Sequence, residues 1–177
     1  MTEHIIIAGA GGQGIMLLGK VLSLAAMKED KFTTWFPSYG AEVRGGAAYC
    51  MVVISNQEIG SPYIDQADTL IIMNRPSFEK FQYRIKNKDL LVLNRSLTNT
   101  QTKQSAYVLS YPFTDIAINL GNIRVANMVA LGCYLAKKNT VDIRTILRVF
   151  EEIAPSDKKQ LVEINKKALY AGIGLIK

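Results

Sequence analysis

HIIIAGAGGQG, residues 4–14, contains the clearest structural signal in the chain. His4 to Ala8 form a short apolar run rich in β-branched residues, which is typical of a buried strand. The run stops at Gly9, where the pattern G-x-G-x-x-G begins, and residues 13–28 then place apolar side chains at helical spacing. A strand, a glycine-rich turn and a helix in this order indicate the first unit of a nucleotide-binding α/β fold.

The glycines of this turn suggest an anion site. The first glycine permits a tight turn, the second leaves no Cβ between the backbone and a ligand, and the last lets the helix pack close to the sheet. The free N–H groups and the positive end of the helix then suit a phosphate group. The alternative is that the glycines only serve a tight strand–helix turn. The candidate cofactor-binding residues are Gly9, Gly11, Gly12, Gln13 and Gly14.

The end of the second expected strand, residues 32–36, bears on which ligand this would be. A standard NAD site has an Asp or Glu there, which binds the ribose hydroxyls. This strand instead ends in Trp35-Phe36-Pro37. The sequence therefore argues against a standard NAD site and leaves another phosphate-bearing ligand open.

The rest of the chain repeats the alternation of strands and helices. Residues 46–55 are apolar on both faces of an expected strand, which indicates burial on both sides. Further strands are expected at 69–73, 90–93 and 107–109, and helices from 76, over 123–138, after a cap at Asp142, and over a last segment ending at Gly172. The predicted fold is α/β and Rossmann-like, with a doubly wound, mainly parallel sheet, helices on both faces and a helical C-terminal third, in one domain over residues 1–177.

Composition excludes several classes of protein. Of the 177 residues, 49% are hydrophobic, which allows a sizeable core. No apolar run reaches the ~18 residues of a membrane span, and the start lacks the basic region of a secretory signal, so we expect a cytoplasmic protein. The net charge of +6 is carried by scattered lysines without an aromatic-basic motif, so we expect no nucleic-acid partner.

No catalytic set is visible. His4 is the only histidine and stands at the chain start, so a Ser-His-Asp triad is not expected. The two cysteines, Cys50 and Cys133, are far apart and form no C-x-x-C pair, so the chain alone is not expected to bind an iron–sulfur cluster or any other metal. We therefore predict a binding domain rather than a complete enzyme, with no catalytic residue of its own.

Four separate stretches carry a resemblance to a known family. They are GAGGQG (9–14), PSYGAEVRGGAAYC (37–50), IGSPYIDQADTLIIMN (59–74) and LGNIRVANMVALG (120–132). In this order they resemble the gamma subunit of the 2-oxoacid:ferredoxin oxidoreductases, a domain shared by pyruvate and ketoisovalerate oxidoreductases. The wording P-S-Y-G-x-E-x-R-G-G followed by I-G-S-P is most similar to the 2-oxoglutarate (KorC-type) members.

The resemblance implies a division of labour. Such enzymes decarboxylate a 2-oxoacid on thiamine diphosphate, pass electrons through iron–sulfur clusters to ferredoxin, and transfer the acyl group to coenzyme A. Alpha and beta subunits would bind thiamine diphosphate and Mg, and a ferredoxin-like subunit the clusters, while this chain would contribute the coenzyme A side at its glycine loop. The alternative is a free-standing Rossmann-like dinucleotide- or nucleotide-binding enzyme or sensor. The missing ribose acid and acid–base residues disfavour that alternative.

Two stretches have both a local and an assembly interpretation. In 36–50, a lone acid and a lone arginine either form a surface ion pair or face a sibling subunit, where a guanidinium suits a carboxylate or phosphate. The apolar helix expected over 123–138 is either buried near the core or packed on a partner, as is the apolar helix over 13–28. The candidate interface or active-site residues are Tyr39, Glu42, Arg44, Gly45, Gly46, Arg124 and Asn127.

Overall fold

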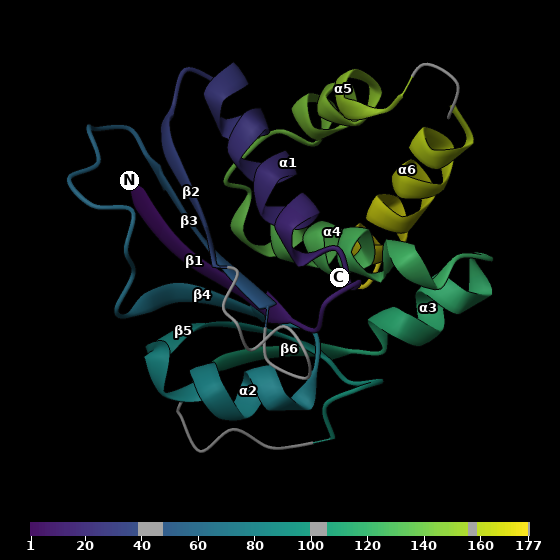
Figure 1. The fold of residues 1–177 in the computed structure, drawn as a ribbon, viewed down its shortest axis with the longest axis horizontal. Coiled ribbons are helices and arrows are strands. Elements are labelled where there is room, and N and C mark those ends of the chain that lie inside the picture. The colour runs from purple at the N-terminus through teal and green to yellow at the C-terminus, as the bar shows by residue number, and fades with distance from the viewer. Residues whose placement is uncertain (39–47, 100–105, 156–158, 177) are drawn as a thin grey trace.

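The computed structural model describes residues 1–38, 48–99, 106–155 and 159–176. The described strands form one six-stranded sheet in the order β2-β3-β1-β4-β5-β6 (Figure 1). Their bounds are β1 Thr2–Gly9, β2 Phe32–Ser38, β3 Ala48–Ser55, β4 Ala67–Ile72, β5 Ile85–Asn94 and β6 Tyr107–Tyr111.

Strand β3 runs against the direction of the rest of the sheet. It pairs antiparallel with β1 on one side and with β2 on the other, whereas β1, β4, β5 and β6 pair in parallel. The prediction of a mainly parallel sheet is confirmed. The sequence predicts consecutive strands over 32–36 and 46–55 with no helix between them, and the two strands pair directly, since antiparallel neighbours need no crossover helix.

Helices cover both faces of the sheet unequally. Figure 1 shows α2 alone on one face, while α1 and the C-terminal helices α4, α5 and α6 lie on the other. The bounds are α1 Ile15–Lys28, α2 Arg75–Phe81, α3 Phe113–Asn119, α4 Ala126–Lys138, α5 Ile143–Ile153 and α6 Lys159–Ile173, with short 3-10 turns at Gln82–Arg84 (η2) and Ile123–Val125 (η3). The predicted helical C-terminal third is thus confirmed. Among the described residues, none of these helices has the length and apolar character that crossing a bilayer requires.

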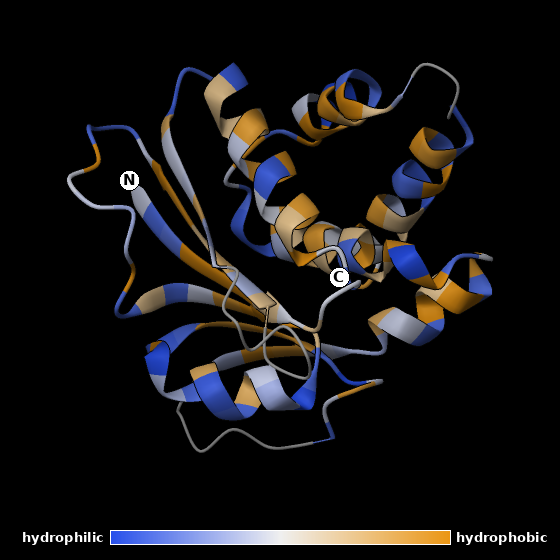
Figure 2. Cartoon of the chain, in the orientation of Figure 1, coloured by the Kyte–Doolittle hydropathy of each residue, from blue (hydrophilic) through white to orange (hydrophobic). Residues whose placement is uncertain are grey.

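The first strand shows why its sequence is an uninterrupted apolar run. Ile5 and Ile7 lie in the larger core under α1 and α4, whereas Ile6 and Ala8 lie in the smaller core with the aromatic side chains of α2. All four are fully buried. A central strand covered on both faces needs apolar side chains at every position, and Figure 2 shows orange, hydrophobic stretches along the strands of the sheet.

The helix α4 is buried by the chain itself. Residues 126–135 are all buried, and α6 packs closely across them. This close approach depends on two glycines, since a Cβ on Gly132 would collide with the carbonyl oxygen of Leu169, and one on Gly172 with that of Val129. The apolar character of residues 126–135 is therefore explained within the chain. Gly172 lies inside α6, which continues to Ile173, so the predicted helix end at this glycine is wrong.

Other boundaries differ for local reasons. Pro37 does not stop the second strand but lies within β2, which is an edge strand, where no further strand requires the missing N–H. Helix α3 was not predicted, because seven residues are too few to show a helical period. The cap predicted at Asp142 is confirmed, since its carboxylate accepts the N–H of Arg144 at 2.7 Å.

Candidate functional site

The glycine loop lies at the edge of the sheet where the parallel strands end. Strand β1 ends at Gly9 and α1 begins after Gly14, which takes a left-handed conformation with φ 70° and leaves the helix without a side-chain cap among the described residues. Gly12 is also left-handed, with φ 86°. Gly11 and Gly12 are exposed, and a Cβ at either would meet nothing within 4 Å. The backbone at these two positions is open to a ligand.

Gln13 closes the base of the loop. Its side-chain oxygen Oε1 accepts a hydrogen bond from the backbone N–H of Ala10 at 2.7 Å. The backbone N–H of Gln13 donates to the Ala10 carbonyl at 3.2 Å. The side chain lies over Gly9, where a Cβ would come within 2.6 Å of Oε1. A side chain at position 9 would therefore displace the Gln13 carboxamide and the Ile15 side chain.

A network of hydrogen bonds joins the loop to the neighbouring strand ends. Nε2 of Gln13 donates to the carbonyl of Met73, which directly follows β4, at 3.3 Å. The same carbonyl accepts from Nδ2 of Asn94, the last residue of β5, at 3.1 Å. Nδ2 of Asn94 also donates to Oγ1 of Thr114 at 2.9 Å. Sequence reasoning missed Asn94 and Thr114, and the only signal was a single amide ending the apolar run of β5.

Asn127 lies against the same loop. It is 2% exposed, and its Nδ2 donates to the Gly14 carbonyl at 3.0 Å while its Oδ1 accepts the N–H of Met128 at 2.9 Å. A Cβ on Gly14 would collide with this amide. The structure therefore brings together two predicted site residues, Gly14 and Asn127, that the sequence did not connect, and it gives Asn127 a contact inside the chain.

Arg124 has a different environment from Asn127, since Asn127 is buried and Arg124 is exposed. It belongs to the short turn η3 and is exposed, and its backbone N–H donates to Oδ1 of Asn122 at 3.0 Å. Asn122 is therefore the N-cap of η3. Because η3 leads directly into α4, Arg124 stands three residues before the amide that contacts the glycine loop, with its side chain open to solvent.

The remaining predicted residues lie in the stretch between β2 and β3. Tyr39, Glu42, Arg44, Gly45 and Gly46 are outside the described residues. The strands on either side are described. Ser38 ends β2 and pairs with Tyr49, while Ala48 begins β3 and pairs with Gly9. Both ends of this stretch are therefore at the same edge of the sheet as the glycine loop.

The cysteines offer no reactive thiolate. Burial raises the pKa of Cys50 and that of Cys133 to about 12. Both thiols are therefore protonated at neutral pH, and a protonated thiol is a poor nucleophile and metal ligand. In the described part of the chain, no group of three or more His, Cys, Asp or Glu could hold a metal ion.

The single histidine serves the opposite end of the first strand. Nδ1 of His4 lies 2.8 Å from a carboxylate oxygen of Asp68, and the backbone N–H of His4 donates to the same oxygen at 2.9 Å. Burial raises the pKa of Asp68, but these hydrogen bonds and the charge of Lys86 outweigh it and leave the pKa lowered. The pair joins the start of β1 to β4, in agreement with the structural role expected for His4.

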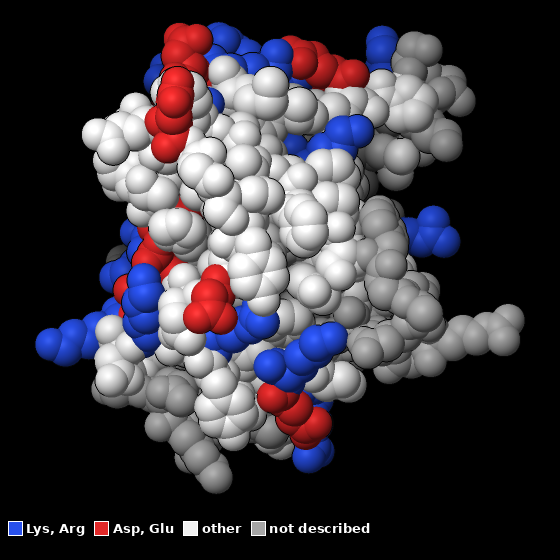
Figure 3. Space-filling model, turned by 60° about the vertical axis from the view of Figure 1, so that its left-hand side comes forward, with Lys and Arg blue, Asp and Glu red and all other residues white. Residues whose placement is uncertain are grey.

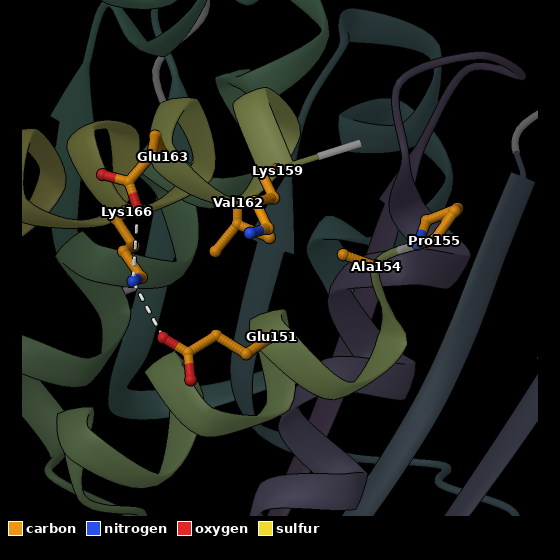
Figure 4. Close-up of a pocket in the computed structure, with 7 residues that line it drawn as sticks. All are labelled: Glu151, Ala154, Pro155, Lys159, Val162, Glu163 and Lys166. Carbon is orange, nitrogen blue, oxygen red and sulfur yellow. Dashed lines mark hydrogen bonds and ion pairs between the residues drawn. The ribbon is translucent and has the colours of Figure 1, made fainter. Parts of the chain in front are cut away.

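A hollow lies between α5 and α6, away from the glycine loop (Figure 4). It has a volume of about 420 Å³, and Val162, Ala154 and Pro155 line it together with charged residues. Three of its charged residues pair with one another, since Nζ of Lys166 lies 2.9 Å from Glu151 and 3.3 Å from Glu163. The hollow is thus a seam between two helices, and no residue of the glycine loop lines it.

The fold and the loop together define an α/β chain with a glycine-rich turn at the ends of its parallel strands. Residues 4–175 match the sequence model of the family described as Pyruvate ferredoxin/flavodoxin oxidoreductase. The chain belongs to this family. The resemblance noted in the sequence is confirmed.

Relatives of known name support the same placement. The chain is 34% identical over 169 residues to the ketoisovalerate oxidoreductase subunit VorA of Methanothermobacter marburgensis, covering 96% of this chain and 35% of that protein. It is 31% identical over 172 residues to the 2-oxoglutarate synthase subunit KorC of Methanocaldococcus jannaschii, covering 94% of this chain and 92% of that protein. The chain therefore spans about a third of the VorA relative and nearly all of the KorC relative.

A solved structure matches over almost the full length of both chains. It is the gamma subunit of a keto/oxoacid ferredoxin oxidoreductase from Geobacter sulfurreducens, with a TM-score of 0.86 and 27% identity. The match covers 98% of this chain and 98% of that one. The arrangement of six strands and the C-terminal helices is thus that of a gamma subunit of this family.

Proposed function

We propose that this chain is the gamma subunit of a 2-oxoacid:ferredoxin oxidoreductase that forms an acyl-CoA by oxidative decarboxylation, with 2-oxoglutarate as the substrate class. The observation that carries the proposal is the similarity to a 2-oxoglutarate synthase subunit over 92% of that subunit's length. Residues 1–177 then act as one domain of a larger enzyme. The alternative of a free-standing dinucleotide-binding enzyme is disfavoured, because β2 ends in Pro37 and Ser38 without the acid that binds ribose.

The proposed partners are alpha and beta subunits that bind thiamine diphosphate and Mg, and a ferredoxin-like subunit that binds iron–sulfur clusters. This chain contains only two cysteines, fewer than the four thiolates that such a cluster needs. The edge strand supports contact with another subunit, since Phe32 and Phe36 are 47% and 42% exposed. On this side of the molecule, charged side chains gather above and below a broad uncharged area (Figure 3).

The proposed ligand of the glycine loop is the pyrophosphate of coenzyme A. Gly11 and Gly12 fit this group, because among the described residues no atom fills the space beside them and α1 begins without a side-chain cap. The net charge of +6 favours an anionic ligand. Coenzyme A, when bound, supplies the thiol that takes up the acyl group.

Purification from the native host tests the assembly. We expect this chain to elute with the sibling subunits, and reconstitution with them to give coenzyme A-dependent oxidation of 2-oxoglutarate with a dye acceptor. The chain alone should give none. Elution as a lone monomer, or turnover by the isolated chain, would contradict the proposal.

A further inference from the structure

The orientation of the Gln13 carboxamide is set by its two neighbours. One is the N–H of Ala10, which only donates, and the other is the carbonyl of Met73, which only accepts. The oxygen of Gln13 must therefore face Ala10, and its nitrogen must face Met73. Whatever fixes the Met73 carbonyl thus fixes which way the Gln13 side chain turns.

Asn94 fixes that carbonyl from the other side. It is 0% exposed, and its Nδ2 lies 3.1 Å from the Met73 oxygen. Thr114 holds the Asn94 carboxamide in place, because its Oγ1 accepts from Nδ2 at 2.9 Å and its N–H donates to Oδ1 at 3.3 Å. A side chain bound on both of its polar atoms in a buried site has one orientation only.

We propose that Asn94 is a positioning residue for the ligand site of the glycine loop, acting through the Met73 carbonyl and Gln13. The inference rests on the proposed function, in which that loop binds coenzyme A. While Gln13 is held, it occupies the Ala10 N–H and leaves Gly11 and Gly12 open. Once released, it no longer holds the Ala10 N–H, and the backbone of Gly11 and Gly12 loses the conformation that leaves its N–H groups open to the phosphate oxygens.

The proposal predicts an effect on binding rather than on turnover. Asn94 is buried behind the loop and touches neither ligand nor reacting atoms, so its loss should raise the KM for coenzyme A and leave kcat nearly unchanged. The loss of one oriented hydrogen bond corresponds to a rise of about tenfold in the KM for coenzyme A.

The experiment uses the enzyme reconstituted from this chain and its sibling subunits. Asn94→Leu keeps the side-chain size and removes both polar atoms. We expect the KM for coenzyme A to rise about tenfold, with kcat changed by less than about twofold. The control is Thr69→Val, which removes another fully buried hydrogen bond, to Glu3, in the first half of β4. It should lower the melting temperature comparably and leave the KM for coenzyme A unchanged.

A double-mutant cycle separates positioning from general loosening. Gln13→Met should raise the KM for coenzyme A about as much as Asn94→Leu, and the double variant should be no worse than either single one, because both act on the same contact. Rises that multiply in the double variant would overturn the proposal. If Asn94→Leu fails to fold, Gln13→Met at its half-buried position still decides, and an unchanged KM overturns the proposal.

The two levels of failure are distinguishable. A wild-type assembly that oxidises 2-oxoglutarate without any dependence on coenzyme A overturns the proposed function, and this inference with it. A wild-type assembly with normal coenzyme A dependence, combined with an Asn94→Leu variant of unchanged KM, overturns only the role of Asn94.

Discussion

At the scale of single residues, side-chain amides do much of the work at the glycine loop. The Gln13 side chain bonds to Ala10 within the loop and to Met73 beyond β4. Asn127, at the start of α4, bonds to Gly14 at the end of the loop. Both amides satisfy backbone groups that have little access to water. A buried polar group left without its partner costs free energy, so these residues should be sensitive to truncation although neither belongs to the apolar core.

Asn127→Ala should destabilise the chain by about 1–3 kcal/mol, because the Met128 N–H loses its side-chain acceptor and the Gly14 carbonyl loses a donor. Urea unfolding of the isolated chain measures the effect. The matched control is Asn119→Ala, an exposed asparagine at the end of α3, which should change stability by less than about 0.5 kcal/mol. Equal effects of the two changes would contradict the anchoring role of Asn127.

Asp68 predicts a particular dependence of stability on pH. Its pKa is lowered below 3.8 in the folded chain, so its carboxylate stabilises the fold above that value, and the contribution is lost as the pH falls through the folded pKa. Asp68→Asn should therefore be less stable than the wild type at pH 5, by about 1 kcal/mol.

The difference in the free energy of unfolding between the wild type and Asp68→Asn should narrow as the pH falls below 3.8. Urea unfolding at a series of pH values between 7 and 3 measures it. The pair formed by Lys166 and Glu163, two exposed or half-exposed side chains on α6, offers a control. Glu163→Gln should cost less than about 0.5 kcal/mol. A constant difference between wild type and Asp68→Asn over the whole range would contradict the assignment.

At the scale of elements, helices α4 and α6 pack so closely that their backbones come into contact. Two glycines, one on each helix, face the backbone of the partner helix. This contact helps to bury residues 126–135 of α4. The apolar residues of this helix, for which the sequence also allowed contact with a partner subunit, are thereby buried inside the chain.

Gly172→Ala should destabilise the chain by about 1–3 kcal/mol, although alanine is the better helix former, because the new Cβ would collide with the backbone carbonyl of Val129 and force the helices apart. Thermal and urea unfolding measure the change. Gly60→Ala is the control, since a Cβ there would meet nothing within 4 Å. A Gly172→Ala variant as stable as the control would show that the two helices are not in the contact described.

At the scale of the whole molecule, the chain is a folded unit whose open backbone site and uncharged flank point outward. The glycine loop and both ends of the stretch between β2 and β3 share one edge of the sheet. No side chain of the described residues covers Gly11 and Gly12 there. Such an arrangement suits a subunit that completes a site formed mainly by its partners.

Arg44→Lys tests the stretch between β2 and β3 in the assembled enzyme. Arg44 lies outside the described residues, so the prediction rests on the sequence, in which it is the only cation between Lys31 and Arg75. Lysine keeps the charge but loses the planar fork that binds carboxylates and phosphates. We expect an unchanged melting temperature of the isolated chain, together with weaker assembly or a higher requirement for coenzyme A.

Glu42→Gln is the companion variant. If Glu42 and Arg44 only pair on the surface, either change should cost at most about 1 kcal/mol of stability and leave the assembled enzyme unaffected. Melting curves and assays of the reconstituted enzyme distinguish the two cases. Normal assembly and a normal coenzyme A requirement in both variants would assign the stretch to local structure.

The sequence by itself determined what depends on neighbours along the chain. The apolar run of β1, the glycine turn and the period of α1 predicted the first βα unit, and the cap at Asp142 predicted where α5 begins. These features rest on hydrogen bonds and side-chain patterns that span only a few residues. The candidate glycines were found for the same reason.

Only the tertiary structure decided what depends on distant partners. The reversed direction of β3 follows from its pairing with β1 and β2 on either side, which no local pattern specifies. The Asn127 amide meets a carbonyl 113 positions away. Asn94 reaches the glycine loop through the end of a neighbouring strand. Such contacts arise when apolar strands pack side by side and bring their ends together, so the residues that hold this site are fixed by the sheet rather than by their sequence neighbours.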